Sequence, residues 1–264
     1  MSEQNILRKD QWLDLLAYQP WETVKELLLP LPWFALAMWA SSQQYYGLTV
    51  FASGYFFLAC LRVSHNAFHY CLGLSRRATD AVMLLLSVFM MTSMRAHQFT
   101  HLLHHRHCLT EKDIEGRIAR QGFWEMLLTA PLFTIRLHRV ALSNAPAKQR
   151  FWINFELLLN LLWLSAVWGW FDLDVLKIHT VIMLLSHAIS PLFTVWSVHR
   201  DCQQKGQGNQ YDSRTLRSTW LSPLAMNMFY HLEHHAYPAV PTCHLPELAR
   251  RLDSAGLDNF KTVL

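Results

Sequence analysis

The stretch His101-Leu102-Leu103-His104-His105 decides the fold, because its spacing returns at His231-Leu232-Glu233-His234-His235. A related box stands earlier in the chain, at His65-Asn66-Ala67-Phe68-His69. Residues at positions i, i+3 and i+4 of a helix lie on one face, so each box can aim two or three imidazoles at a common point. The three boxes therefore predict a metal site built from helices.

Histidines that merely pack in a core are the alternative interpretation of the boxes. Clustered imidazoles away from water destabilise a fold when they are unpaired, and no equal supply of carboxylates accompanies these boxes. Eight box histidines also exceed the three or four protein ligands of a usual single zinc site, which favours two metal ions. Imidazole suits Zn, Cu, Fe and Ni alike, so spacing alone does not choose the metal.

The boxes resemble those of the membrane fatty acid desaturase and hydroxylase superfamily, which read HxxxH, HxxHH and HxxHH. The likeness extends to HLLHHRH at 101–107 and to YHLEHHAYPAVPTCHLPEL at 230–248, which are similar to the family's second box and C-terminal signature. Order and spacing agree from His65 onward. The resemblance implies a non-haem di-iron centre, held mostly by imidazole, that activates O2 to attack an unactivated C–H bond.

The activity implied by this resemblance is that of a membrane-bound fatty acyl desaturase with two Fe ions (Fe2+/Fe3+) and O2 as co-substrate. The acyl chain would belong to a lipid, an acyl-CoA or an acyl-carrier protein. The sequence contains no recognisable haem or iron–sulfur domain, so a separate ferredoxin or haem electron carrier is expected. A hydroxylase or carotenoid-modifying oxygenase on the same scaffold stays open, because the boxes do not separate desaturation from oxygen transfer. A membrane zinc hydrolase or a metal-sensing receptor is a more distant alternative.

Two further residues join the candidate site. His199 resembles the extra histidine that the family carries between its second and third boxes. Asn227 stands four residues before His231 and could hold a metal-bound water on the same helical face. The expected metal ligands are His65, His69, His101, His104, His105, His199, His231, His234 and His235, with Asn227 as a water-mediated ligand. The other six histidines, His97, His107, His138, His179, His187 and His244, are not expected to bind metal.

Composition indicates one compact domain over residues 1–264, with 52% hydrophobic residues and nine glycines in 30.9 kDa. The net charge of +4 comes from basic residues scattered beside apolar stretches, which favours a membrane surface over nucleic acid. Five cysteines form no CxxC pair and no disulfide framework, as in a reducing compartment. Charged residues within the first 26 positions predict a retained cytoplasmic amphipathic helix rather than a signal peptide.

Four apolar stretches predict an all-α membrane protein with four spans in two hairpins. Residues 27–46 and 48–64 form the first hairpin, and residues 151–171 and 173–198 form the second. About 20 helical residues at 1.5 Å each cross a ~30 Å hydrocarbon core. Of 23 Lys and Arg, only Lys177 falls on the side of the two turns, so the positive-inside rule places both termini and all three boxes in the cytoplasm. The membrane would be the inner one in a bacterium.

Shorter segments complete the expected fold. Residues 80–94 are too short to cross and predict a re-entrant or interfacial helix. Residues 123–142 predict a helix lying in the membrane interface. Glu156 and Asn160 are costly in lipid and are expected to face the bundle or the boundary. A short helix is expected around residues 245–252.

Residues that support the site are harder to choose. A metal-bound imidazole usually donates its other N–H to a carboxylate or carbonyl, and the carboxylates considered nearest in sequence are those of Asp80, Asp201, Asp212 and Glu233. Aromatic residues on the spans could line a tunnel for an acyl chain, although most aromatics there only pack or meet lipid. The tunnel candidates are Phe56, Phe57, Phe89, Trp196 and Phe229.

Overall fold

The computed structural model describes residues 7–202 and 213–256. Apart from one isolated bridge residue, its regular structure is helical throughout these two ranges, as the sequence predicts. The helices are α1 (Pro20–Leu28), α2 (Leu31–Ser42), α3 (Tyr46–Phe68), α4 (Arg76–Met90), α5 (Met94–His107), α6 (Phe123–Thr129), α7 (Phe133–Asn144), α8 (Ala147–Gly169), α9 (Asp174–Ile189), α10 (Ser197–His199), α11 (Leu221–Leu224), α12 (His231–Ala236) and α13 (Leu245–Ser254). Four 3-10 turns cover Lys9–Gln11, Leu13–Leu16, Gly116–Arg120 and Ala130–Leu132, and a π-helix covers Leu192–Trp196.

Within the described part of the chain, three continuous helical segments are long and apolar enough to cross a membrane. They are α3, α8 and the run from α9 through the π-helix to α10, with 23, 23 and 26 residues. The predicted spans at 48–64, 151–171 and 173–198 are therefore confirmed as candidates. Their length and composition place the protein in the membrane. A fourth candidate is a bent pair, α4 with α5, whose axes meet at 110°.

The predicted span at 27–46 is wrong in its extent. Helix α1 ends at Leu28 and α2 has only 12 residues, about 18 Å at 1.5 Å per residue, which is short of a ~30 Å core. Pro30 and Pro32 stand at the break, and proline lacks the N–H that a continuous helix needs. Helices α2 and α3 still form a hairpin, because they pack side by side along α2.

The N-terminal segment also differs from the prediction. The described part of the first 26 residues forms two short 3-10 turns and the beginning of α1, in place of one amphipathic helix. Residues 1–6 lie outside the described chain. The predicted interfacial helix at 123–142 is divided into α6 and α7 by a 3-10 turn that contains Pro131. The helix predicted at 245–252 is present as α13.

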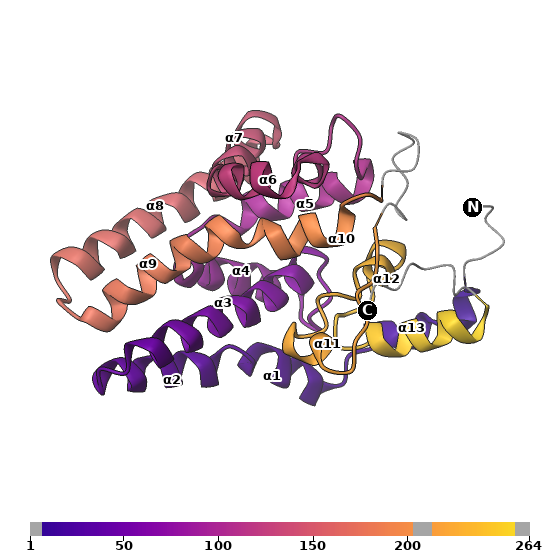
Figure 1. The fold of residues 1–264 in the computed structure, drawn as a ribbon, viewed down its shortest axis with the longest axis horizontal. Helices are drawn as coiled ribbons and strands as arrows, with labels where there is room; N and C mark the ends of the chain where they lie inside the picture. Colours follow the sequence, from indigo (N-terminus) through magenta and orange to yellow (C-terminus); the bar gives the residue numbers. More distant parts are fainter. Residues whose placement is uncertain (1–6, 203–212, 257–264) are drawn as a thin grey trace.

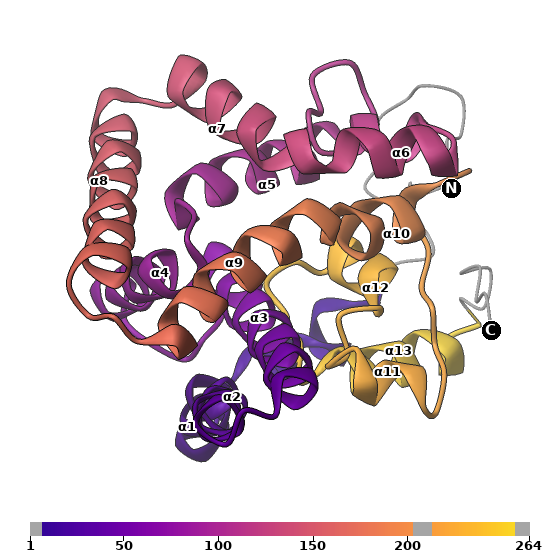
Figure 2. The same cartoon turned by 60° about the vertical axis from the view of Figure 1, so that its left-hand side comes forward.

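The two hairpin turns, between α2 and α3 and between α8 and α9, lie at the same end of the molecule (Figure 1). Helices α12 and α13 lie at the opposite end, beside α10. Figure 2 shows α5 beneath α6 and α7, while α9 runs between them and α3. A core of buried apolar side chains joins α3, α4 and α9. This core leaves the ends of α3, α5 and α10 facing α12, and that is where the histidine boxes meet.

Candidate metal centre

Four helical segments bring the histidines together. The end of α3 carries His65 and its cap residue His69, and α5 carries the second box. His199 is the last residue of α10, and α12 carries the third box. Each box is helical, so the i, i+3 and i+4 spacing puts its imidazoles on one face, as predicted.

One group of four histidines combines all three boxes. Its members offer nitrogen atoms that lie within 4.8 Å of one another: His65, His69, His101 and His234. The Nε2 atoms of His69 and His101 are 3.1 Å apart. We call this group the first tetrad.

A second group of four is fully buried and lies beside the first. It consists of His104, His199, His231 and His235, again with nitrogen atoms within 4.8 Å of one another. The Nε2 of His199 is 3.1 Å from that of His104 and 2.8 Å from that of His231. The Nε2 of His235 is 3.2 Å from that of His104. This second tetrad contains the histidine that lies outside the three boxes, His199.

His105 lies between the two tetrads. Its Nε2 is 3.2 Å from the Nε2 of His101 and 2.9 Å from that of His234, both in the first tetrad. Its ring stacks on His235 of the second tetrad, with centroids 4.3 Å apart. All nine histidines proposed as ligands from the sequence therefore lie in one continuous cluster.

Asn227 lies in a different setting from the one the sequence suggested. Helix α12 begins at His231, and Asn227 belongs to a turn before it, with φ +61°. Its backbone N–H donates to Ser222 O. The shared helical face on which its role as a water-mediated ligand depended is therefore absent. The left-handed turn at Met226 and Asn227 separates Asn227 from α12, and a water-mediated contact between Asn227 and a metal stays a prediction.

Two carboxylates contact the Nδ1 atoms of histidines in the second box. The Nδ1 of His104 is 2.8 Å from Asp113 Oδ2, and the Nδ1 of His101 is 3.4 Å from Glu115 Oε2. Asp113 also accepts from the backbone N–H of Leu109 at 2.8 Å. A carboxylate on Nδ1 fixes the tautomer with Nε2 free to bind a cation, and it orients the ring.

The loop after α5 is shaped for this support. Gly116 N–H donates to Asp113 Oδ1 at 2.9 Å, and a Cβ at Gly116 would collide with that carboxylate. Glu115 also accepts from the hydroxyl of Thr100 on α5, at 2.9 Å. Both carboxylates are buried. Glycine at position 116 is therefore required for the close approach of the loop to its own carboxylate.

Of the four carboxylates selected from the sequence, the three that the structure describes do not fill this role. Asp80 pairs with Arg95, and Glu233 pairs with Arg217. Asp201 is exposed, and Asp212 lies outside the described residues. The sequence analysis does not select Asp113 and Glu115, which lie in a polar stretch after the second box. Their short distance along the chain from His104 was the signal that could have identified them, because a tight loop must return towards the helix it leaves.

Electrostatics favour neutral imidazoles in the third box. Burial and the neighbouring histidines hold the pKa of His231, His234 and His235 well below its usual range. A neutral imidazole has one bare nitrogen, and in the tetrads these nitrogens point at one another rather than at donors. The Nδ1 atoms of His65 and His235 are buried without a hydrogen-bond partner. Such a set of lone pairs fits two metal cations, one per tetrad, and the all-imidazole donors suit iron as well as zinc, copper or nickel.

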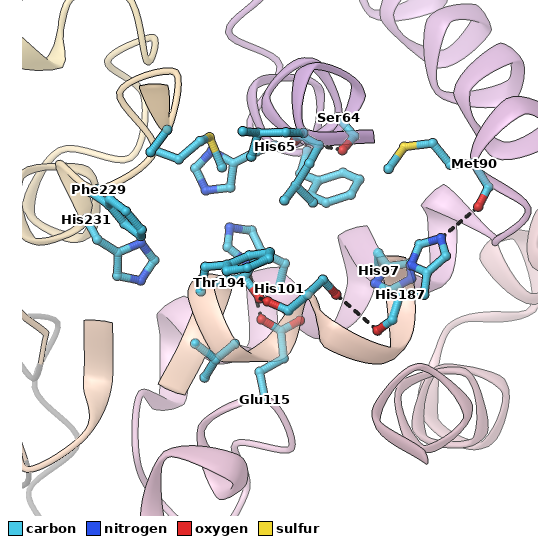
Figure 3. A pocket seen from close by; sticks show the side chains of 18 of the residues that line it. Ser64, His65, Met90, His97, His101, Glu115, His187, Thr194, Phe229 and His231 are labelled. Carbon is cyan, nitrogen blue, oxygen red and sulfur yellow. Dashed lines mark hydrogen bonds and ion pairs between the residues drawn. The ribbon is translucent and has the colours of Figure 1, made fainter. Parts of the chain in front are cut away.

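A cavity of about 370 Å³ opens beside the histidine cluster. Figure 3 shows His65, His101 and His231 around one part of it and His97 and His187 around another. Its walls are mainly apolar and come from α3, α4, α5, α7, the π-helix, α11 and the segment before α12, through residues that include Leu58, Leu61, Phe68, Met90, Met94, Phe133, Leu137, Phe193, Leu224, Met228 and Phe229.

The aromatic residues expected to line a tunnel are mostly elsewhere. Only Phe229 of the five borders this cavity. Phe56 and Phe57 are buried in the core of α3, α4 and α9, with Phe89 packed against that core. Trp196 donates its indole N–H to Gln121 O, 3.0 Å away. These side chains pack in the interior because their helical faces point at neighbouring helices, which the sequence of a single span does not reveal.

The comparisons with known proteins agree with the boxes. The family model described as fatty acid desaturase matches residues 41–260, which includes every clustered histidine. No curated protein matches the chain. Because the family match spans most of the sequence and the histidine-rich centre lies within it, the chain belongs to the fatty acid desaturase family.

Proposed function

We propose that this protein is a membrane-bound fatty acyl desaturase that uses two iron ions, O2 and externally supplied electrons to introduce a C=C bond into an acyl chain. The observation that carries the proposal is the pair of histidine tetrads beside an apolar cavity. When bound, the iron ions supply the oxidising chemistry with O2 that an unactivated C–H bond requires, which no protein side chain can supply.

The histidines and their partners have separate tasks in this proposal. His65, His69, His101 and His234 would hold one ion, and the second tetrad would hold the other, with His105 placed to contact the first. Asp113 and Glu115 keep the rings of the second box in one orientation. Fixed rings hold the ion positions constant relative to the cavity, which is the condition for attack at one carbon.

The cavity would bind the acyl chain. Its volume lies within the range of ligand pockets, and its apolar walls exclude water from the chain. His65, His101, His104 and His231 border it, so a methylene group in the cavity lies close to both tetrads. The walls thus bring a C–H bond to the ions without any polar handle on that part of the substrate.

The surroundings of the site suggest its partners. The distribution of Lys and Arg favours a cytoplasmic site, reached from the end opposite the two hairpin turns. A soluble ferredoxin or haem carrier would deliver electrons there, and the substrate would come from membrane lipid, acyl-CoA or acyl-carrier protein.

The proposal is tested by metal analysis and by lipid mass spectrometry together. Protein produced with iron should hold close to two iron ions per chain, and host lipids should gain acyl species lighter by two hydrogens. A chain with His104→Ala, produced to the same level, is the control. An added oxygen in the product would assign hydroxylation instead, and zinc without iron would favour a hydrolase or a sensor.

A further inference from the structure

A break between two helices lies inside the apolar bundle. Helix α4 ends at Met90 and α5 begins at Met94, with a bend of 110° between them. Met91 closes α4 in the left-handed conformation, with φ +57°. A helix end leaves backbone C=O and N–H groups without partners, and lipid cannot satisfy them. The chain must therefore satisfy this break from its own side chains.

Helix α8 provides two of the required partners. Glu156 Oε2 accepts from Ser93 Oγ at 2.6 Å and from the Arg95 backbone N–H at 2.9 Å. Asn160, in the amide orientation that satisfies its neighbours, donates to Ser87 O at 2.8 Å and accepts from the Thr92 N–H at 3.1 Å. Glu156 is 1% exposed and Asn160 is 7% exposed. The two polar residues of this span thus face the bundle, as predicted, and they cap both ends of the break.

Histidines of two other helices complete the capping. On α9, His179 donates to Phe89 O at 3.0 Å and His187 donates to Met90 O at 2.7 Å. On α7, His138 Nε2 accepts the Ser93 N–H at 3.2 Å. Side chains of three helices therefore satisfy the backbone between Ser87 and Arg95, and we call these five side chains the bend socket.

The helix that begins at the bend socket serves both tetrads. Helix α5 contributes His101 to the first tetrad and His104 to the second, with His105 between them. Asp113 and Glu115 hold its far end, as described above. Its near end is held by Glu156, through the first turn at Ser93 and Arg95.

We propose that Glu156 is a positioning residue for the metal centre, because it anchors the first turn of α5 and so sets where the second box meets the other histidines. The inference rests on the proposed metal site but not on the reaction performed there. Both hydrogen bonds reach the same carboxylate oxygen, so the single oxygen of an amide can still accept both. Glu156→Gln should preserve the anchor, whereas Glu156→Leu leaves two buried donors unpaired.

A control contact exists on the same helix, α8. Trp168, twelve residues along the chain from Glu156, donates to Thr180 Oγ1 on α9 at 3.1 Å. Thr180→Val removes that polar contact and should lower thermal stability without touching α5. A variant that only destabilises the bundle is thereby separated from one that moves the second box.

The experiment compares wild type, Glu156→Gln, Glu156→Leu and Thr180→Val as purified full-length proteins. Amide hydrogen exchange is measured in metal-free protein over residues 93–98, and bound iron is then counted after reconstitution with Fe2+. Glu156→Leu should speed exchange by ~10-fold or more over these residues, because a lost helix cap opens the first turn. It should also bind fewer iron ions than wild type, while Glu156→Gln and Thr180→Val keep the wild-type exchange and iron count.

The inference fails if Glu156→Leu keeps the exchange rate and iron count of wild type. It fails equally if Thr180→Val loses as much iron, because general destabilisation would then explain both variants. Should wild type itself bind no iron, the proposed function fails, while the exchange data still decide whether Glu156 anchors α5.

Discussion

Two buried groups of histidines lie a few turns apart in this protein and differ in what their nitrogens face. In the tetrads, Nε2 atoms lie 2.8 to 3.2 Å from one another, as between His199 and His231 or between His104 and His235. In the bend socket, the ring nitrogens of His138, His179 and His187 face backbone groups. Residue type is the same in both groups, and each group contains buried and partly buried side chains, so the partners distinguish them.

The difference follows from the chemistry of imidazole. A neutral ring has one N–H donor and one bare nitrogen, and a carbonyl satisfies the donor completely. Several bare nitrogens that face one another are not stabilised unless a cation lies between them. Burial opposes the protonation of these imidazoles. The bend histidines therefore find hydrogen-bond partners within the protein, whereas the clustered histidines need a metal ion between their nitrogens. Substitutions in each group test this distinction.

The largest effect is expected from loss of a clustered histidine. His234→Ala removes a member of the first tetrad, and His104→Ala removes one of the second. Each variant should lose at least one metal ion. Its activity should fall by more than the roughly 10- to 100-fold loss that is typical when a hydrogen-bond partner of a metal ligand is removed. Metal content of the purified variants and product yield give the measurement.

His179→Gln is the control for those variants, because an amide can still donate to Phe89 O in the bend. It should retain both ions. Full activity in His234→Ala would contradict the assignment of the first tetrad, and metal loss in His179→Gln would remove the distinction between the two groups.

An intermediate effect is expected from the carboxylate behind the second box. Asp113→Ala removes the acceptor of the His104 Nδ1–H and should weaken metal affinity by about 10- to 100-fold. Metal titration of the stripped protein measures this. The exposed Asp201, which the sequence analysis selected in place of Asp113, is the comparison: Asp201→Ala should bind as wild type does. Equal loss in both variants would refute the support by Asp113.

The smallest effect on stability and metal content is expected when the pH of the wild-type protein is lowered slightly below neutral. The pKa of His231, His234 and His235 is lowered in the folded protein, and a free histidine titrates near ~6.5. The unfolded chain therefore binds more protons than the folded one below that pH. The stability that these groups contribute is complete above about pH 6.5 and is lost progressively as the pH falls towards the lowered values.

Metal release should follow the same direction, because protons compete for the ligating nitrogens. Bound metal and the unfolding midpoint, measured from about pH 8 to about pH 4, should both decline below roughly pH 6.5. A midpoint that rises on acidification would contradict the neutral cluster.

Local patterns in the sequence predict those parts of the molecule that depend on helical periodicity. The i, i+3, i+4 boxes indicated which imidazoles share a face, and apolar length indicated α3, α8 and α9. His199 was placed by its family order alone, yet it lies within the second tetrad. The failures have other causes. Pro30 and Pro32 interrupt an apolar stretch, and the turn at Asn227 interrupts a helical face.

Contacts across the bundle could not be predicted from one span at a time. Asp113 reaches His104 because a loop closes on Gly116, and composition does not encode such a closure. Glu156 and Asn160 were expected to face the bundle, but their partners on the α4–α5 bend belong to another helix. The sequence indicates that burying these polar residues in an apolar span costs free energy. Only the fold shows which hydrogen bonds offset that cost.

The place of α12 in the chain has a consequence for biosynthesis. Translation proceeds from the N-terminus, so both hairpins are made before the third box. Until α12 is added, the first tetrad has three of its histidines and the second has two, because His231, His234 and His235 are missing. A nascent chain that stalls earlier offers only partial coordination to a metal ion. The order of synthesis thus prevents the histidine cluster from being complete until both hairpins have been made.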